Sequence, residues 1–196
     1  MKSVRFRFTC LFAGLTALSL GTPALAQAQA PNQPMAPSET KEFGDWTVRC
    51  YPAAAKVPCE MIEMLVNKKT GRRVLGLLIV YNKDKDRYVM QIAMPLGVLI
   101  QNGAVLATDT FRSPVLRYRL CDMQGCYAIT GLDDAAIKAF GSATKAQMQI
   151  VSAEGKKFNI GFSLNGFTAS HEALLQMMQK SPAPAAAHAP APAQGG

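Results

Sequence analysis

Apolar and polar residues alternate with a period of two along several stretches of this chain. Trp46–Cys50 alternates in this way, which is typical of a strand with one buried face. Three more stretches show the same period: residues 88–94, 116–120 and 158–164. Residues 74–81 form a nearly continuous apolar run instead, which predicts a central strand covered on both faces.

Turn-forming residues separate these apolar stretches. Residues 67–71 and 82–86 are polar and contain Asn, Asp, Gly and Lys, and Asn102-Gly103 and Glu154-Gly155 are shorter signals of the same kind. Such residues tolerate tight hairpin turns. Closely spaced strands joined by these turns predict a mainly antiparallel β protein, either a sandwich or a barrel.

Two short helices are predicted among the strands. Asp133 or Asp134 can cap a helix that buries Ile137 and Phe140. A second helix is predicted over residues 168–179 because its apolar residues recur with a helical period. They are His171, Leu174, Leu175 and Met178. This pattern predicts a helix that lies on the sheet.

The first 26 residues have the three parts of a secretory signal. They begin with three basic residues, continue with an apolar run over residues 8–20, and end with a small-x-small pattern at residues 24–26. A membrane-spanning helix needs about 20 apolar residues, so this run is too short to be an anchor. We predict cleavage after Ala26 and no membrane-spanning segment in the mature protein. The expected location is the periplasm, the outer membrane or the cell exterior.

Two segments of the mature chain have the composition of unfolded linkers. Residues 27–40 are rich in Gln, Ala and Pro, and residues 181–196 are mostly Ala and Pro. Neither can bury enough apolar surface to offset the loss of chain entropy. The folded domain is therefore predicted over residues 41–180. Removal of the signal lowers the formal net charge from +8 to about +5, which is too diffuse to predict binding to nucleic acid.

Four cysteines remain once Cys10 is removed with the signal: Cys50, Cys59, Cys121 and Cys126. An even number in an exported protein predicts two disulfides. Three pairings are possible, and short loops favour Cys50 with Cys59 and Cys121 with Cys126. Zinc binding is the competing use, but zinc ligand pairs usually lie about two to four residues apart. We therefore predict disulfides and no metal or cofactor.

The chain has no recognisable catalytic motif. Its two histidines are His171, on the apolar side of the second helix, and His188, in the Ala-Pro tail. No serine sits in a nucleophile elbow and no Gly-rich phosphate loop is found. We therefore predict a protein that is not an enzyme and has no catalytic residues. The alternative is an exported enzyme that uses His171 together with a carboxylate.

The methionines suggest a second alternative, a periplasmic copper-binding protein. Met61, Met64, Met90 and Met94 can supply thioether ligands. Methionine also fills irregular cores, and Met90 and Met94 already share one face of a predicted strand. Core packing is therefore the favoured interpretation.

Basic residues cluster in two of the predicted turns. The first turn holds Lys68, Lys69, Arg72 and Arg73, and the second holds Lys83, Lys85 and Arg87. If the two turns share one end of the fold, they form a patch that can meet an anionic surface. Exposed turns carry charge for solvation alone, and this is the simpler interpretation.

Four segments occur in an order that resembles the invasion-associated locus B family of Gram-negative envelope proteins. They are residues 43–50 (Phe-Gly-Asp-Trp-Thr-Val-Arg-Cys), 94–98 (Met-Pro-Leu-Gly-Val), 119–126 with its two cysteines, and 164–167 (Leu-Asn-Gly-Phe). The resemblance covers most of residues 43–178. The four cysteines match those of the family, and Pro95, Leu96 and Gly97 match a structural turn.

This resemblance implies an immunoglobulin-like β-sandwich in the periplasm or at the outer membrane. It supplies no catalytic residues, and founding members of the family are linked to invasion of host cells, especially erythrocytes. We therefore expect a non-catalytic envelope protein that acts by binding, with the loops as its contact surface. The expected partner is an envelope or host-surface protein, a lipid or a glycan, and not a nucleic acid.

Overall fold

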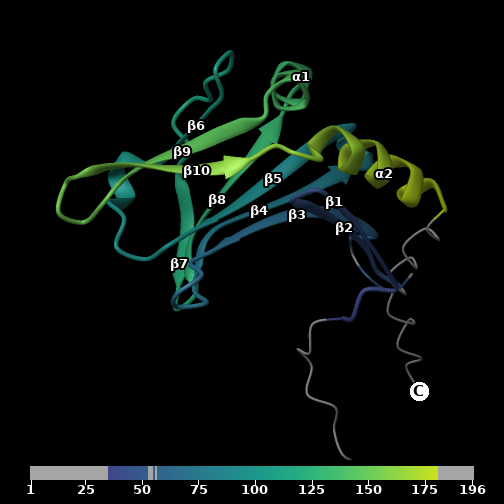
Figure 1. Ribbon diagram of the computed structural model, residues 1–196, viewed down its shortest axis with the longest axis horizontal. Coiled ribbons are helices and arrows are strands. Elements are labelled where there is room, and N and C mark those ends of the chain that lie inside the picture. The colour runs from purple at the N-terminus through teal and green to yellow at the C-terminus, as the bar shows by residue number, and fades with distance from the viewer. Residues whose placement is uncertain (1–34, 53–54, 56, 181–196) are drawn as a thin grey trace, which may run out of the picture. The chain divides into compact units, whose positions relative to one another are not determined.

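The computed structural model describes residues 35–52, 55 and 57–180. These residues form ten β-strands in two antiparallel sheets, together with two α-helices (Figure 1). The prediction of a mainly antiparallel β protein with two short helices is confirmed. The predicted signal peptide, most of the linker and the Ala-Pro tail with His188 lie outside the described residues.

The larger sheet has seven strands in the order β1-β2-β3-β4-β5-β8-β7. They are β1 (Glu39–Phe43), β2 (Trp46–Cys50), β3 (Cys59–Val66), β4 (Arg73–Asn82), β5 (Arg87–Met94), β7 (Tyr118–Asp122) and β8 (Gly125–Leu132). β1 to β5 are consecutive hairpins, with η1 (Lys83–Lys85) in the last turn. The Asn67 side chain accepts a hydrogen bond from Lys69 N at 2.9 Å, and that of Asn82 accepts one from Lys85 N at 3.0 Å. These bonds fix the two turns predicted from their sequences.

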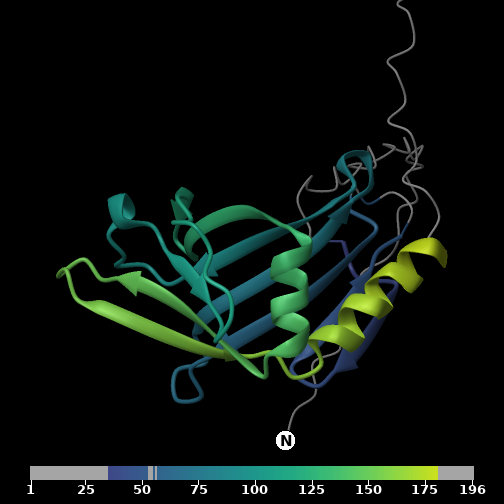
Figure 2. The same ribbon diagram turned by 90° about the horizontal axis from the view of Figure 1, so that it is seen from above.

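The second sheet has three strands in the order β10-β9-β6. They are β6 (Val105–Ala107), β9 (Lys145–Val151) and β10 (Lys157–Ser163), and the 3-10 turn η2 (Ile100–Asn102) precedes them. The helices are α1 (Asp134–Ser142) and α2 (Phe167–Lys180). Figures 1 and 2 show the smaller sheet and both helices on the same side of the larger sheet. That side of the larger sheet therefore holds the core.

Both helices match their sequence patterns. Asp133 caps α1, where its carboxylate accepts a hydrogen bond from Ala136 N at 2.8 Å. Phe140 is buried, whereas Ile137 is half-buried and packs against the core. α2 begins one residue before its predicted start and buries Leu174 and Met178 against the sheet.

The inward residues of the larger sheet form one hydrophobic core with the elements that cover it. Its fully buried members include Trp46, Val48, Met61, Ile79, Met90, Ile92 and Ala128. From the covering elements, Met148, Phe162 and Leu174 complete this core. Burying a large apolar side chain contributes roughly 1.5–3 kcal/mol, so this layer is the main source of stability.

The prediction that β4 is covered on both faces is wrong. Its inward residues Leu75, Leu77 and Ile79 are buried, but the outward side chains of Val74, Leu78 and Val80 are only half-buried. No described helix or strand covers that side (Figure 1). The apolar run therefore reflects the central position of β4 and an outward face that is itself apolar.

The alternation of residues 116–120 also fails, because a β-bulge intervenes. Tyr118 pairs with the inward residue Ala128, whereas Leu120 pairs with the outward residue Tyr127, so the register shifts between them. Leu120 is consequently 57% exposed.

β10 keeps its alternation but is buried only towards its end. Phe158 is 49% exposed and Phe162 only 5%, because the β9–β10 hairpin extends beyond the larger sheet (Figure 2).

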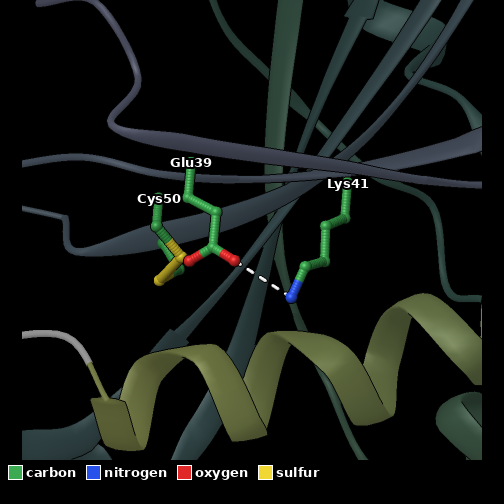
Figure 3. Close-up of polar contacts among 4 residues, drawn as sticks. Glu39, Lys41 and Cys50 are labelled. Atoms are coloured by element: carbon green, nitrogen blue, oxygen red, sulfur yellow. Dashed lines mark ion pairs between the residues drawn. A yellow bond between two sulfur atoms is a disulfide. The ribbon is translucent and has the colours of Figure 1, made fainter.

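β1 begins at Glu39, two residues before the predicted start of the folded domain. The strand extends this far because Ser38 N donates a hydrogen bond to Cys50 O at 2.8 Å. Figure 3 shows Glu39 and Lys41 paired beside Cys50 and facing α2, with 2.9 Å between Glu39 Oε1 and Lys41 Nζ. Both side chains are about half exposed, so this pair adds little stability. Charges on an edge strand do hinder pairing with another chain.

Candidate functional site

Two of the sequence motifs, residues 43–50 and 164–167, pack against each other. Asp45 N donates a hydrogen bond to Asn165 O at 3.2 Å. Trp46 Nε1 donates to Ser163 O at 3.2 Å, and the Trp46 ring meets the Phe167 ring edge to face with 5.2 Å between centroids. The first strands of the domain are therefore tied to the start of its last helix.

A glycine makes this close approach possible. Gly166 has φ +88°, and a Cβ added to it would lie 1.8 Å from Phe43 O. No other residue fits that backbone and that spacing. The conformation of the motif thus reflects packing between two chain segments.

The motif at residues 94–98 carries the chain from the larger sheet to the smaller one. Gly97 O accepts a hydrogen bond from Ala153 N at 2.7 Å, and Leu99 N donates to Val151 O at 2.8 Å. Both partners belong to the end of β9 and the turn that follows it. The predicted structural turn is therefore a crossover that positions the smaller sheet.

A pocket of about 690 Å³ lies between β3 of the larger sheet and the β9–β10 pair of the smaller sheet. Its walls are residues 63–65, 145–147 and 161–163, completed by Asp45 and residues 107–109. Asp45 and Ser163 belong to the contact between the two motifs or lie next to it, so that contact also shapes the pocket. Its volume lies within the range of about 300–1,000 Å³ that is usual for small-molecule sites.

Glu63 is the unusual residue in this pocket. It occupies an inward position of β3, in step with the buried Met61, and is only 7% exposed. Its Oε1 accepts a hydrogen bond from Ser163 N at 3.1 Å. Among the described residues, its Oε2 has no hydrogen-bond partner. A buried polar atom without a partner costs about 1–3 kcal/mol.

The surroundings of Glu63 change its acidity. Burial raises the pKa of the Glu63 carboxyl from 4.5 to about 7. The hydrogen bond from Ser163 opposes this rise, and the negative charge of Asp45 adds to it. Near neutral pH, Glu63 therefore exchanges readily between its neutral and charged forms.

The pocket is acidic in a basic protein. Its described lining residues include the carboxyls of Asp45, Glu63 and Asp109 and the ammonium of Lys145. Three carboxylates and one ammonium give the pocket a formal charge of −2 when Glu63 is ionised, whereas the whole chain carries +8. An acidic lining of this kind attracts cations.

Comparison with known proteins identifies the family. The sequence profile described as Invasion associated locus B (IalB) protein matches residues 46–175, about two thirds of the chain. The chain belongs to this family. The resemblance predicted from the four sequence motifs is thereby confirmed.

A solved structure supports the fold of this IalB-family chain. The crystal structure of invasion associated protein B from Bartonella henselae is similar with a TM-score of 0.65 and 23% sequence identity. The similarity covers 72% of this chain and 99% of that chain. At this identity the likeness shows the fold alone. No curated protein matches the chain in sequence.

His171, the candidate base of the alternative enzyme, lies against the larger sheet. Its ring stands 4.7 Å from the Tyr88 ring and is stacked 6.2 Å from the Phe167 ring, between centroids. Burial lowers the pKa of His171, and the charge of Glu172 opposes this effect. His171 does not line the acidic pocket. Its surroundings are those of a packing residue.

The four methionines of the copper alternative do not share one surface. Met64 is 50% exposed on the outward side of β3, whereas Met61, Met90 and Met94 are buried on the inward side. Among the described residues, no group of three or more His, Cys, Asp or Glu side chains is placed to hold a metal ion.

The two basic turns lie at opposite ends of the ten-residue strand β4. At about 3.3 Å per residue, they are roughly 30 Å apart, so they do not form one basic patch. Arg73 is also engaged elsewhere, because its Nη2 donates a hydrogen bond to Gln124 O at 2.6 Å.

The structure joins Cys50 to Cys59 and Cys121 to Cys126. Each pair links residues that face each other on neighbouring strands. These are the pairs that short loops favour. Neither described helix is long and apolar enough to cross a membrane.

Sequence reasoning missed Glu63, Asp109 and Lys145. Only Glu63 left a signal, because it places one charged residue in the inward series of β3, which otherwise reads Cys59, Met61 and Leu65. Asp109 and Lys145 lie far from β3 in sequence, and only the fold brings them to the pocket.

Proposed function

We propose that this IalB-family chain is an exported, non-catalytic envelope protein that acts by binding, and that the pocket between the two sheets is its binding site. The observation that carries this proposal is the Glu63 carboxyl. It is buried in the wall of a pocket and has one oxygen without a hydrogen-bond partner among the described residues. A ligand that bonds this oxygen removes a desolvation cost that the free protein bears.

The cysteines and the N-terminal sequence support a compartment outside the cytoplasm. Two disulfides fit an oxidising compartment outside the cytoplasm, and the predicted signal peptide provides the route. We place the protein in the periplasm, at the outer membrane or outside the cell. The name of the Bartonella protein motivates a link with host cells, which comes to this chain only as part of the proposal.

Acid–base catalysis at the same pocket is a second candidate function. A carboxyl with a pKa of about 7 can both donate and accept a proton at neutral pH. Binding is favoured because the described lining residues pair this carboxyl with no histidine or cysteine. The serine among the lining residues, Ser163, uses its hydroxyl to accept a hydrogen bond from Asn165 N at 3.1 Å, which is a structural role. Turnover of an envelope component that is lost in Glu63→Gln would favour catalysis instead.

The test compares the mature protein with a variant whose pocket is narrowed. Gly161 lines the pocket, and a Cβ added there meets no atom within 4 Å, so the larger side chain of Gly161→Leu begins in open space. Immobilised protein is incubated with protein, lipid and glycan fractions of the bacterial envelope. A component retained by the wild type and lost in Gly161→Leu supports the proposal.

The matched control is Gly131→Leu, on the outward side of β8, where the nearest atom to an added Cβ is Tyr88 O at 3.9 Å. This variant should retain the same component as the wild type. The proposal fails if no component is retained, or if Gly161→Leu retains it equally well.

A further inference from the structure

The acidic pocket combines two kinds of surface that suit one class of ligand. Its polar groups are the carboxyls of Asp45, Glu63 and Asp109, and its apolar groups include Leu65 and Phe162. Phe162 is 5% exposed and belongs to the core, so it holds the base of the pocket in place, and the half-buried Leu65 offers the more open apolar surface. Charged groups of one sign beside an apolar wall fit a ligand with cationic ends and a hydrocarbon body.

We propose that this pocket binds a free aliphatic polyamine, with one ammonium group hydrogen-bonded to Glu63 Oε2 and a second near Asp45 or Asp109. The inference rests on the proposed function and names the ligand class of that site. An ammonium group has three donors and no acceptor. It can bond Oε2, which is buried without a partner among the described residues, once the Glu63 side chain turns this atom towards the pocket that it lines. The methylene chain between the ammonium groups lies on the apolar wall.

The balance of charge favours a dication over a single amine. With Glu63 ionised, the described lining residues carry three negative charges and one positive charge, from Lys145. Two ammonium groups neutralise the resulting formal charge of −2. Ion pairs gain strength where burial lowers the dielectric constant, and Glu63 is 7% exposed. A ligand with one positive charge leaves part of this charge uncompensated.

A metal ion fits the pocket less well than an organic cation. In the part of the chain that the structure describes, no group of three or more His, Cys, Asp or Glu side chains is placed for coordination. Calcium also needs six to eight oxygen ligands, and one Glu63 oxygen is already bonded to Ser163 N. An ammonium group needs only a few well-placed acceptors.

Binding should depend on pH through Glu63. Its carboxyl is mostly ionised at pH 8 and mostly protonated at pH 5.5, because its pKa lies at about 7. Alkylammonium groups stay charged over this range. The other charged groups that line the pocket are Asp45, Asp109 and Lys145. Affinity should therefore fall by at least about 10-fold between pH 8 and pH 5.5, and this fall should vanish in Glu63→Gln.

The experiment is calorimetric titration of the mature protein with 1,6-diaminohexane and with spermidine, at pH 8 and pH 5.5. The wild type should bind both probes at pH 8. Glu63→Gln should weaken binding at pH 8 by about 10-fold or more, while Glu42→Gln, an exposed carboxyl on β1, should leave it unchanged. Lys145→Ala should tighten binding by a few-fold, because it removes the opposing charge. The uncharged analogue 1,6-hexanediol should not bind.

A second variant keeps the test valid if Glu63→Gln does not fold. Asp45 is exposed in the β1–β2 turn and lines the pocket, so Asp45→Asn should weaken diamine binding without disturbing the core. Thermal unfolding at pH 8 shows whether each variant is folded.

Three results would overturn the inference. They are no diamine binding to the wild type at pH 8, equal binding by Glu63→Gln, and equal binding of 1,6-hexanediol. The wild type can fail to bind the diamines and still retain an envelope component that Gly161→Leu does not retain. In that case the pocket binds another class of ligand and the proposed function stands. If the wild type binds neither the diamines nor any envelope component, both proposals fail.

Discussion

The larger sheet is covered by two different kinds of structure, and the two parts of the molecule differ in how completely they close. Under α2, Trp46, Phe167 and His171 pack ring against ring on the first strands and on β5. Under the smaller sheet, the β9–β10 pair leaves a pocket beside β3 in which Glu63 is buried. One part holds a packed histidine, and the other holds a carboxyl that is only partly bonded.

The difference between these two parts shows that a buried atom without a partner does not by itself mark a ligand site. Glu63 Oε2 and His171 Nε2 are both buried atoms without a hydrogen-bond partner among the described residues. His171 is half-buried against two aromatic rings and does not line the acidic pocket. Glu63 lines the acidic pocket, so a rotation of its side chain can bring the unpartnered oxygen to a ligand. The acidic lining of that pocket makes Glu63 the candidate site.

The largest expected effect is in the part covered by α2. Trp46→Ala should lower the free energy of unfolding by about 3–5 kcal/mol, because it removes a ring that is 1% exposed and its bond to Ser163 O. Met148→Ala, at a fully buried position of the smaller sheet, removes a smaller side chain and should cost less, within the range of about 2–5 kcal/mol. Urea unfolding of the two variants measures both. A larger loss in Met148→Ala would mean that the part with the pocket is the more tightly packed one.

Next in size are the two disulfides, one at the end of each part. Cys121→Ser should lower stability by at least as much as Cys50→Ser, each by about 2–4 kcal/mol. The Cys121–Cys126 bond holds the bulged edge strand β7 in register, and its loss frees that edge. Urea unfolding ranks the variants, and mass mapping of the non-reduced mature protein checks the pairing. A peptide that links Cys50 to Cys121, or four free thiols, would contradict it.

The pocket should also show a stability change with pH. Because the pKa of Glu63 rises from 4.5 to about 7 on folding, the folded state holds the proton more tightly than the unfolded state does. Stability from Glu63 is thus greatest below about pH 4.5 and falls as pH rises to about 7, by about 3 kcal/mol in total. Unfolding of the wild type and Glu63→Gln at pH 4.5 and pH 8 tests this. Equal differences at both pH values would show that Glu63 is not buried as a carboxyl.

His171 should give the smallest effect, with the opposite slope. Burial lowers its pKa, so the folded state disfavours the proton and stability falls as pH drops below about 6.5. His171→Phe keeps the ring stacking and removes the buried Nε2, so it should raise stability at pH 8 by about 1 kcal/mol and by more at pH 5. Loss of stability at both pH values would indicate that Nε2 has a partner in solution.

The sequence predicted the elements of the fold well where each depends on local chemistry. The hairpin turns at residues 67–71 and 82–86 and the Asp133 cap are formed by side chains that bond their own backbone. The faces of β4 and β7 could not be predicted in this way. Burial of β4 depends on which side of the larger sheet the helices and the smaller sheet cover. Burial of β7 depends on a bulge that leaves no sign in the alternation.

The candidate site was beyond sequence reasoning for a related reason. The charge of Glu63 at an inward position of β3 was visible in the alternation, but its meaning depends on what faces it. Ser163, which bonds Glu63, lies 100 residues further along the chain. Lys145 and Asp109 reach the pocket only because the crossover at residues 94–98 brings the smaller sheet over the larger one.

The contact between Trp46 and Ser163 joins residues 117 positions apart, and this spacing constrains the order of assembly. A chain that emerges from synthesis or transport N-terminus first presents β2 long before α2 is available to cover it. The core around Trp46 therefore stays open until nearly the whole domain has emerged. Trp46 is the single tryptophan of the chain, so its fluorescence follows one event, the arrival of the last helix on the first strands.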